Sequence, residues 1–285
     1  TPVARQLAKD LGVDIKTVVG TGEHGRIMKE DIMKKAQSNK PLSYASPSNP
    51  EPTYIQPAVT VSVQGDVEYV PITKLRKAIV NSMTKSKQII PHTTVMDEVA
   101  IDDLVELRNK VKEQGAAQDI KLTYMAFVMK AVVLSLKKFP MFNASFDQAN
   151  DRMILKKFIN LGMAVDTPDG LIVPNIKDAD KKSILELAKE LRDVANQTID
   201  RKVQLSQLQN TTFSITNFGA ANLMYGTPII NHPEVAILGV GRIEQRAVVE
   251  NGQIVARYMM PISLAVDHRV IDGADAGRFL TYFKS

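Results

Sequence analysis

The 285-residue chain contains no cysteine. It therefore cannot form disulfides or thiolate zinc sites, and it has no cysteine nucleophile. Histidine is also scarce, because His24, His92, His232 and His268 are the only four and they are spread along the sequence. Since a metal site needs clustered ligands, we expect no metal cofactor.

Long apolar runs and strong charge are absent as well. The longest apolar stretch, Leu122 to Leu136, is interrupted by Lys130 and is shorter than the roughly 20 residues that a membrane helix needs. The net charge of +5 is scattered, without Lys/Arg runs, so we expect neither nucleic acid nor a membrane as a partner. We also expect no signal peptide at the start of the sequence. These features, with an ordinary apolar and charged composition, predict a soluble intracellular enzyme.

The distribution of proline divides the sequence into three parts. Residues 1–37 predict a small helical domain. Residues 38–66 hold five of the fourteen prolines and predict an extended, flexible linker that separates its neighbours. Residues 67–285 predict one mixed α/β domain, because segments with strand and helix patterns alternate along them.

Two helices are predicted in the small domain. Thr1 is a suitable N-cap for the first, which carries an apolar stripe of Val3, Leu7 and Leu11. The second begins near Lys29. Together they form a unit at the lower edge of the size that folds unaided.

A loop with three glycines, residues 19–27, joins the two helices. Phosphate binding is disfavoured, because no strand precedes the loop and no Gly-Lys-Ser/Thr follows it. A tightly folded loop instead needs an acceptor for its backbone amides. We expect buried Asp31 to be that acceptor, since a carboxylate can accept several amide hydrogen bonds.

Four basic residues of the small domain predict one charged face: Arg5, Lys9, Lys16 and Arg26. Arg5 and Lys9 lie one helical turn apart. Such a face would suit docking to an acidic partner. An ordinary solvated surface is the alternative, and charge alone does not decide between them.

Helices and strands alternate in the large domain. Helices are expected from residue 73, over 101–114 and 122–138, and from Ser183, which forms a capping box with Glu186. Strands are expected at residues 93–99, 160–165, 171–176, 211–216, 235–240 and 247–258, with turns at 169–170 and 251–252.

The sequence Asp-His-Arg-Val-Ile-Asp-Gly at residues 267–273 follows an apolar strand, 261–266, and precedes a helix, 273–283. His268 is therefore expected in an exposed turn. Imidazole, whose unperturbed pKa is about 6.5, can take up a proton and return it. Asp272 could orient His268 or hold the turn. The pattern alone is weak, and a purely structural histidine is equally consistent with it.

Further motifs occur in a fixed order: Gly-Thr-Gly-Glu-His-Gly-Arg-Ile at 20–27, Leu-Gly-Met-Ala-Val at 161–165, and Asn-His-Pro-Glu-Val-Ala-Ile-Leu-Gly at 231–239. The first resembles the peripheral subunit-binding domain of 2-oxo acid dehydrogenase complexes. The others, with residues 267–273, resemble the catalytic domain of dihydrolipoamide acyltransferases. The resemblance covers nearly the whole chain except the linker and implies a mixed-sheet domain similar to chloramphenicol acetyltransferase.

This resemblance implies a core subunit that moves an acyl group between the dihydrolipoamide of a lipoyl domain and coenzyme A. We expect a fragment that lacks the lipoyl domain and part of the C-terminal tail, so that lipoyl groups are supplied in trans. His268 would remove the thiol proton of coenzyme A. Thr216, where the family commonly has serine, would donate a hydrogen bond to the oxyanion. An ordinary strand residue is the alternative for Thr216.

Supporting roles also follow from the resemblance. Asp272 matches the motif's carboxylate, and Arg76 resembles its salt-bridge partner in chloramphenicol acetyltransferases, so both would position the site. Asn217 is a weaker candidate on the substrate side. His92 and His232 match family positions and are expected to serve structure.

The implied assembly is a trimer, with His268 of one subunit facing Thr216 of its neighbour, and eight or twenty trimers in a cubic or icosahedral core. Arg5, Lys9, Lys16 and Arg26 would contact the 2-oxo acid decarboxylase or dihydrolipoamide dehydrogenase. The location would be the cytoplasm, or the mitochondrial matrix in a eukaryote. A non-catalytic scaffold subunit and a free acyltransferase acting on a small alcohol are the alternatives. The pattern is closest to acetyltransferases, with succinyl and branched-chain specificity left open.

Overall fold

The computed structural model describes residues 2–10, 13–22, 25–38, 61–117 and 119–285. Its contacts divide the chain into two units, Thr1–Glu68 and Tyr69–Ser285. Most of the predicted linker lies outside the described residues, as do the predicted cap Thr1 and the stripe residue Leu11. Among the described helices, none has the length and hydrophobicity needed to cross a membrane.

The first unit is built from α1 (Pro2–Asp10), a 3-10 turn (Ile15–Thr17) and α2 (Lys29–Ser38). Its core contains Ala4, Ala8 and Ile32, all buried. The predicted stripe is wrong at Val3, whose side chain is 65% exposed, whereas Leu7 packs against this core. The buried face of α1 is displaced by one residue toward two alanines, whose small side chains let α1 and α2 pack closely.

The glycine-rich loop folds around Asp31, as predicted. The carboxylate of Asp31 accepts hydrogen bonds from Thr21 N (3.1 Å), Thr21 Oγ1 (2.7 Å) and Met28 N (2.8 Å). These bonds, chiefly the one from Met28 N, hold the pKa of Asp31 below its ordinary value. Gly20 is required here, because a Cβ at this position would lie 2.5 Å from the carbonyl oxygen of Gly25.

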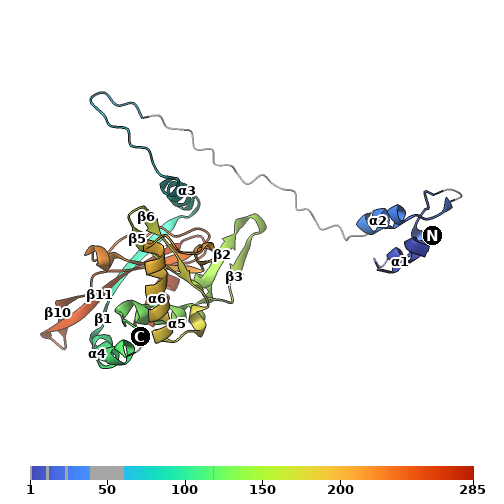
Figure 1. Ribbon diagram of the computed structural model, residues 1–285. Helices are drawn as coiled ribbons and strands as arrows, with labels where there is room; N and C mark the ends of the chain where they lie inside the picture. Colours follow the sequence, from blue (N-terminus) through green and yellow to red (C-terminus); the bar gives the residue numbers. More distant parts are fainter. Residues whose placement is uncertain (1, 11–12, 23–24, 39–60, 118) are drawn as a thin grey trace. The chain divides into compact units, whose positions relative to one another are not determined.

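The second unit is a mixed α/β domain, which confirms the predicted fold class (Figure 1). Its helices are α3 (Lys74–Ile89), α4 (Asp102–Ala116), α5 (Tyr124–Lys138), α6 (Ile184–Ile199) and α7 (Gly273–Lys284). Its strands are β1 (His92–Ala100), β2 (Ala144–Asp147), β3 (Arg152–Leu155), β4 (Leu161–Met163), β5 (Val165–Thr167), β6 (Gly170–Ile172), β7 (Asn175–Ile176), β8 (Phe213–Asn217), β9 (Ala236–Val240), β10 (Glu244–Glu250) and β11 (Gln253–Asp267).

The main sheet has the strand order β1-β11-β9-β8-β4-β7, and β10 pairs with the first half of β11. Strand β8 is parallel to β9 and β4, whereas β11 is antiparallel to β1, β9 and β10. The strands β2 and β3 form one separate hairpin, and β5 and β6 form another. Figure 1 shows the β10–β11 ribbon extending beyond the rest of the sheet.

Alternate residues of the strands contribute to two different hydrophobic clusters. Leu238 and Leu264 belong to the main cluster, which also contains Val132 of α5 and Phe279 of α7. Their neighbours Ile237 and Ala265 belong to a smaller cluster with Ile90 and Ile230. Because successive strand residues point to opposite faces, α5 and α7 cover one face and the segments around 90 and 230 cover part of the other.

Several boundaries differ from those predicted. The single strand expected at 247–258 is two strands, joined at Asn251 and Gly252, whose positive φ values of 51° and 79° confirm the predicted turn. The other turn lies at residues 168–169, because Gly170 already pairs with Thr167. The β2–β3 hairpin was not predicted. The capping box of Ser183 and Glu186 is confirmed.

Candidate active site

His268 lies in the turn between β11 and α7 and is exposed. The preceding Asp267 is only 1% exposed. Its carboxylate accepts hydrogen bonds from Arg269 Nε (2.9 Å), Arg269 Nη2 (2.6 Å) and Arg269 N (3.1 Å). The backbone of the turn is held further, because His268 N donates to Pro91 O (3.1 Å) and Ile271 N donates to Asp267 O (3.0 Å). The imidazole therefore projects from a fixed backbone.

Arg269 connects this turn to the β2–β3 region. Its guanidinium lies over the ring of Phe146, 5.1 Å from the centroid, and Nη1 donates to Gln148 Oε1 (3.1 Å). A bidentate Arg–carboxylate pair fixes both partners in direction as well as distance. The paired Asp267 and Arg269 thus restrain the residue between them.

Asp272 occupies the N-cap position of α7. Its backbone carbonyl accepts from Ala276 N (3.0 Å), but its side chain is exposed and makes no hydrogen bond or ion pair to a residue that the structure describes. Arg76 lies in the first turn of α3, and its guanidinium lies beside the β5–β6 hairpin. A Cβ atom added to Gly170 would lie 3.3 Å from Arg76 Nη2. Within the described part of one chain, Arg76 and Asp272 form no ion pair.

Thr216 and Asn217 end strand β8. Thr216 is half-buried and alternates with Phe213 and Ile215 of the main core, so it lies on the face opposite α5 and α7. The amide oxygen of Asn217 accepts from Ala220 N (3.2 Å) and caps the following 3-10 turn. Thr216 therefore faces the less covered side of the sheet.

Strand register separates Thr216 from His268 within one chain. Thr216 pairs with Gly239, and Gly239 pairs with Ser263. From Ser263, Asp267 lies four residues, or about 13 Å, further along β11, and two strand spacings add about 10 Å across the sheet. Two catalytic side chains must each come within about 3 Å of the reacting atoms, so this separation is large for a site built from one chain.

A buried carboxyl group lies beside the strand that supports the His268 turn. Glu234 is 2% exposed; Oε1 accepts from Asn231 Nδ2 (2.8 Å), while Oε2 has no hydrogen-bond partner among the described residues. Burial raises the pKa of Glu234 to about 7. Burial also lowers the pKa of the neighbouring Lys156 amine, whereas the charge of Glu234 raises it.

Sequence reasoning did not assign roles to Asp267, Arg269 or Glu234. Asp267 and Arg269 flank His268 directly. An acidic and a basic residue on either side of the histidine were the signal in the sequence that could have predicted their pairing. Glu234 lies in the 231–239 motif, but an acidic residue next to a proline gives no sign of burial. Its environment depends on long-range packing.

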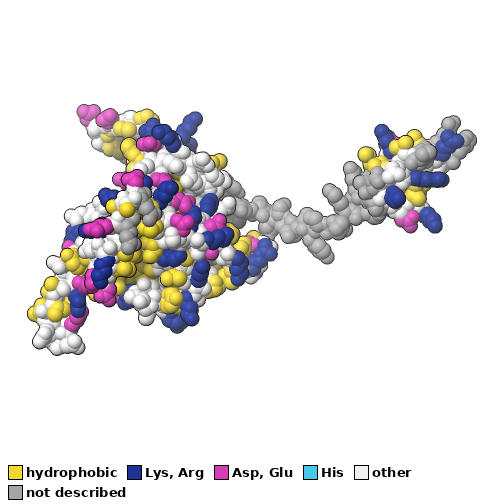
Figure 2. Space-filling view, turned by 60° about the horizontal axis from the view of Figure 1, so that its bottom comes forward, with side chains coloured by type: hydrophobic (Ala, Val, Ile, Leu, Met, Phe, Trp, Pro, Cys, Tyr) yellow, Lys and Arg dark blue, Asp and Glu magenta, His cyan; other side chains and the backbone are white. Residues whose placement is uncertain are grey.

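The basic residues Arg5, Lys9, Lys16 and Arg26 are all exposed, and none forms an ion pair within the described residues. Figure 2 shows Lys and Arg side chains on the surface of the small domain. The predicted charged residues are thus accessible. Their solvent exposure is compatible with both docking and simple solvation.

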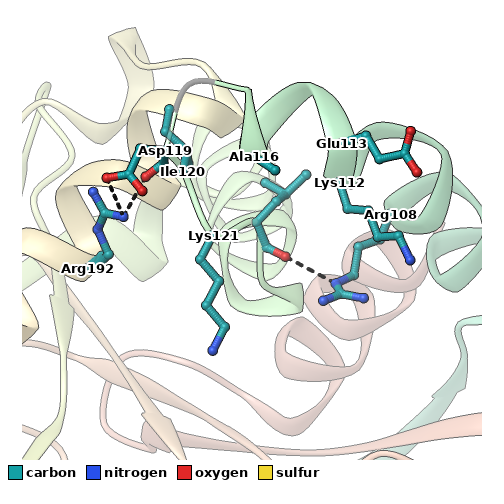
Figure 3. Close-up of a pocket in the computed structure, with 9 residues that line it drawn as sticks. Arg108, Lys112, Glu113, Ala116, Asp119, Ile120, Lys121 and Arg192 are labelled. Atoms are coloured by element: carbon teal, nitrogen blue, oxygen red, sulfur yellow. Dashed lines mark hydrogen bonds and ion pairs between the residues drawn. The ribbon is translucent and has the colours of Figure 1, made fainter.

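A cavity of about 450 Å³ lies between α4, the α4–α5 connection and α6 (Figure 3). It contains none of the predicted site residues. Arg192 Nη1 is paired with Asp119 (3.6 Å), and Arg108 Nε donates to Leu122 O (3.1 Å). Since α4 follows the Ala100 end of β1, whereas His268 lies near the opposite end, this cavity is separate from the His268 turn.

The fold and the anchored turn define a protein with a small helical domain and a mixed-sheet domain that presents a candidate histidine base. The chain belongs to the 2-oxoacid dehydrogenases acyltransferase family. Residues 64–285 match the catalytic domain of that family, and residues 1–33 match the e3 binding domain.

Similar proteins include a dihydrolipoyllysine-residue acetyltransferase component of the pyruvate dehydrogenase complex from Acholeplasma laidlawii. It is 53% identical over 100% of this chain, which spans about half (53%) of that relative's length. Two solved structures each cover 81% of this chain and 96% of their own, with 36% identity. One is the Azotobacter vinelandii dihydrolipoamide acetyltransferase (TM-score 0.78), and the other is the cubic core of a pyruvate dehydrogenase multienzyme complex (TM-score 0.77).

Proposed function

We propose that this chain transfers an acyl group, most suitably acetyl, between the dihydrolipoamide of a lipoyl domain and coenzyme A. The observation that carries this proposal is the exposed imidazole of His268 on a turn that Asp267, Arg269 and Pro91 hold in place. A fixed, accessible imidazole is suited to general-base catalysis near neutral pH. The acetyltransferase name of the A. laidlawii relative favours acetyl over succinyl and branched-chain groups.

Residue spacing supports the assignment of the catalytic groups. The A. vinelandii structure comes from work on the role of a serine, a histidine and an asparagine in catalysis; the serine precedes the histidine by 52 residues and the asparagine follows it by four. Thr216, His268 and Asp272 have the same two spacings. Threonine for serine keeps the hydroxyl, whereas aspartate for asparagine changes the charge. We therefore assign Asp272 a positioning role, together with Arg76 and Asn217.

In the proposed reaction, His268 removes the thiol proton of coenzyme A, and the thiolate attacks the acyl carbonyl of the thioester. A carbon–sulfur bond forms, and the carbonyl electrons move to oxygen. The Thr216 hydroxyl donates a hydrogen bond to this oxyanion. When the tetrahedral intermediate collapses, the bond to dihydrolipoamide sulfur breaks, and that sulfur takes the proton from His268. The histidine is neutral again after each turnover.

The proposed assembly completes the site. A neighbouring copy would supply Thr216 opposite His268, in a trimer that joins a larger core such as the cubic core structure. The first 37 residues would dock dihydrolipoamide dehydrogenase or the 2-oxo acid decarboxylase through the basic face. The lipoyl group and coenzyme A enter as substrates, and a cytoplasmic location fits a bacterial complex of this kind.

Replacement of the proposed base tests the function. In an assay with dihydrolipoamide and acetyl-CoA, His268→Ala should lower turnover about 100- to 10,000-fold. Lys112→Gln, in the separate cavity beside α4, is the matched control and should leave turnover unchanged. Near-normal turnover in His268→Ala would remove the base assignment. Wild-type inactivity with every short acyl donor would favour a non-catalytic scaffold subunit.

Acyl specificity needs a direct comparison. Acetyl, succinyl and isobutyryl donors should be compared in one assay under the same conditions. We expect the highest kcat/KM with acetyl. A clear preference for succinyl or isobutyryl would assign the chain to a different 2-oxo acid.

Docking depends on charge in this proposal. Arg26→Glu should weaken binding of dihydrolipoamide dehydrogenase and reduce the salt dependence of that binding, because screening acts on exposed charges. Lys29→Glu, which alters an exposed lysine of the same domain outside the proposed face, is the control. Unchanged affinity and salt dependence in Arg26→Glu would exclude Arg26 from the interface.

A further inference from the structure

The backbone that holds His268 rests on two segments that are distant in the sequence. Strand pairing places His92 opposite Asp267. Next to this pair, Pro91 O accepts from His268 N (3.1 Å), and Asp267 N donates to Val235 O (2.9 Å). The position of the His268 turn therefore depends on the start of β1 and on the loop that leads into β9.

The ring of His92 joins those two segments to each other. Ile230 N donates to His92 Nε2 (3.0 Å), and His92 Nδ1 lies 2.9 Å from Ile90 O. An amide nitrogen can only donate, so Nε2 must be the acceptor and the ring hydrogen must be on Nδ1, where it donates to Ile90 O. The carbonyl of fully buried Ile230 accepts from Ser86 Oγ (2.5 Å), so both backbone groups of Ile230 are bound.

The hydrogen-bond pattern is compatible only with the neutral ring. A second ring proton, on Nε2, would be directed at the N–H of Ile230 and would leave that buried amide without an acceptor. Burial, the main cause, and Lys87 of α3 lower the pKa of His92, whereas the bond to Ile90 and the charge of Asp267 on β11 raise it. The 230–235 loop adds His232 and Glu234 as its titratable residues.

We propose that His92 is a positioning residue for acyl transfer: as the Nδ1–H tautomer it ties the 230–235 loop to the start of β1 and thereby fixes the backbone of His268. This inference rests on the proposed function of His268. His92 touches neither substrate nor reacting atoms in this account. Loss of the link should lower kcat with little change in KM, because a misplaced base impairs the chemical step more than substrate binding.

Two amide substitutions separate the two hydrogen bonds of the ring. Glutamine can place an oxygen near the position of Nε2 and accept from Ile230 N, whereas asparagine can only reach the position of Nδ1 and donate to Ile90 O. His92→Gln should keep kcat within about threefold of wild type, and His92→Asn should lose about 10- to 100-fold, with KM within about twofold in both. Equal impairment of the two variants, or full activity of His92→Asn, would overturn the proposal.

Acid titration gives a second readout that a merely structural role would not move. Because protonation of the His92 ring would break the link to Ile230, the acid limb of wild-type kcat should contain one more inactivating proton than the acid limb of His92→Gln. If His92→Asn does not assemble, this comparison decides the matter. The same acid limb in wild type and His92→Gln would contradict the proposal.

Amide hydrogen exchange tests the link independently of catalysis. Exchange at Ile230 and His268 should accelerate in His92→Asn and stay near wild type in His92→Gln, with Leu238 in the central strand as an unaffected reference. This measurement works even if no acyl transfer is detected, so failure of the proposed function and failure of the His92 link are distinguishable. Unchanged exchange in His92→Asn would rule the link out.

Discussion

At the scale of single residues, the Thr216 hydroxyl is the group whose proposed role is most easily isolated. Valine has nearly the shape of threonine without the hydroxyl, and serine keeps the hydroxyl without the methyl group. Thr216→Val should lower kcat about 100- to 1000-fold, the usual effect of removing an oxyanion donor. Thr216→Ser should remain active. The measurement is steady-state acyl transfer to dihydrolipoamide.

The serine variant is also the control for packing, because it removes more volume than valine does. If Thr216→Val and Thr216→Ser had the same kcat, the hydroxyl would have no catalytic role. The interpretation of Thr216 as an ordinary strand residue would then hold.

Glu234 should make folding stability depend on pH. Its pKa is about 7 in the folded protein and about 4.5 when unfolded, so the folded state binds more protons between these values. Stability from this group is fully present below pH 4.5 and is lost as pH rises through 7. The difference corresponds to about 3 kcal/mol of unfolding free energy.

Glu234→Gln removes the titration while keeping a side chain of similar shape. Its unfolding free energy should change less between pH 5 and pH 8 than that of wild type, as measured by urea denaturation. Glu113→Gln, at an exposed position, should behave like wild type. An unaltered pH dependence in Glu234→Gln would mean that Glu234 is not the buried titrating group.

At the scale of elements, Asp31 stabilises the small domain, whose hydrophobic core is small. It binds the amides of Thr21 and Met28 and joins the glycine-rich loop to α2. Asp31→Asn should accelerate amide exchange at both positions, because both amides donate to the same oxygen, Oδ2, and a neutral amide oxygen accepts them more weakly than a carboxylate does. Asp14→Asn, which alters an exposed cap of the 3-10 turn, is the comparison. Protection of Thr21 and Met28 that matches wild type would contradict this role.

The long elements of the fold could be predicted from the sequence because their signals are local. Capping residues and apolar periodicity indicated α3, α5, α6 and α7, and the Asn-Gly turn indicated the β10–β11 ribbon. The β2–β3 hairpin was missed because its four-residue strands have no clear alternation. The buried face of α1 was misassigned because alanine carries a weak hydrophobic signal, although Ala4 and Ala8 form its core.

The candidate site was predictable only where a motif is continuous. His268 and Asp272 belong to one segment, and family resemblance added Thr216. The contacts that hold the turn join residues far apart in the sequence: Pro91 with His268, and His92 with Ile230. Such contacts follow from strand order, which no local pattern specifies.

At the scale of the whole molecule, strand register is what supports the proposed shared site. Thr216 lies level with Ser263, whereas His268 follows the far end of β11. This separation is set by the backbone of the central sheet, not by side-chain rotation. In a cyclic assembly, the same surface contact repeats around the axis, so each copy can give His268 to one site and Thr216 to another.

Complementation between two inactive variants tests whether two copies share one site. His268→Ala and Thr216→Val should be unfolded and refolded together in equal amounts, and acyl transfer should be compared with each variant refolded alone. If the site is shared, random assembly gives about a quarter of the sites an intact His268 and an intact Thr216, and activity should return to about a quarter of wild type. Activity that stays at the sum of the two separate variants, in mixed assemblies verified by mass spectrometry, would contradict the account.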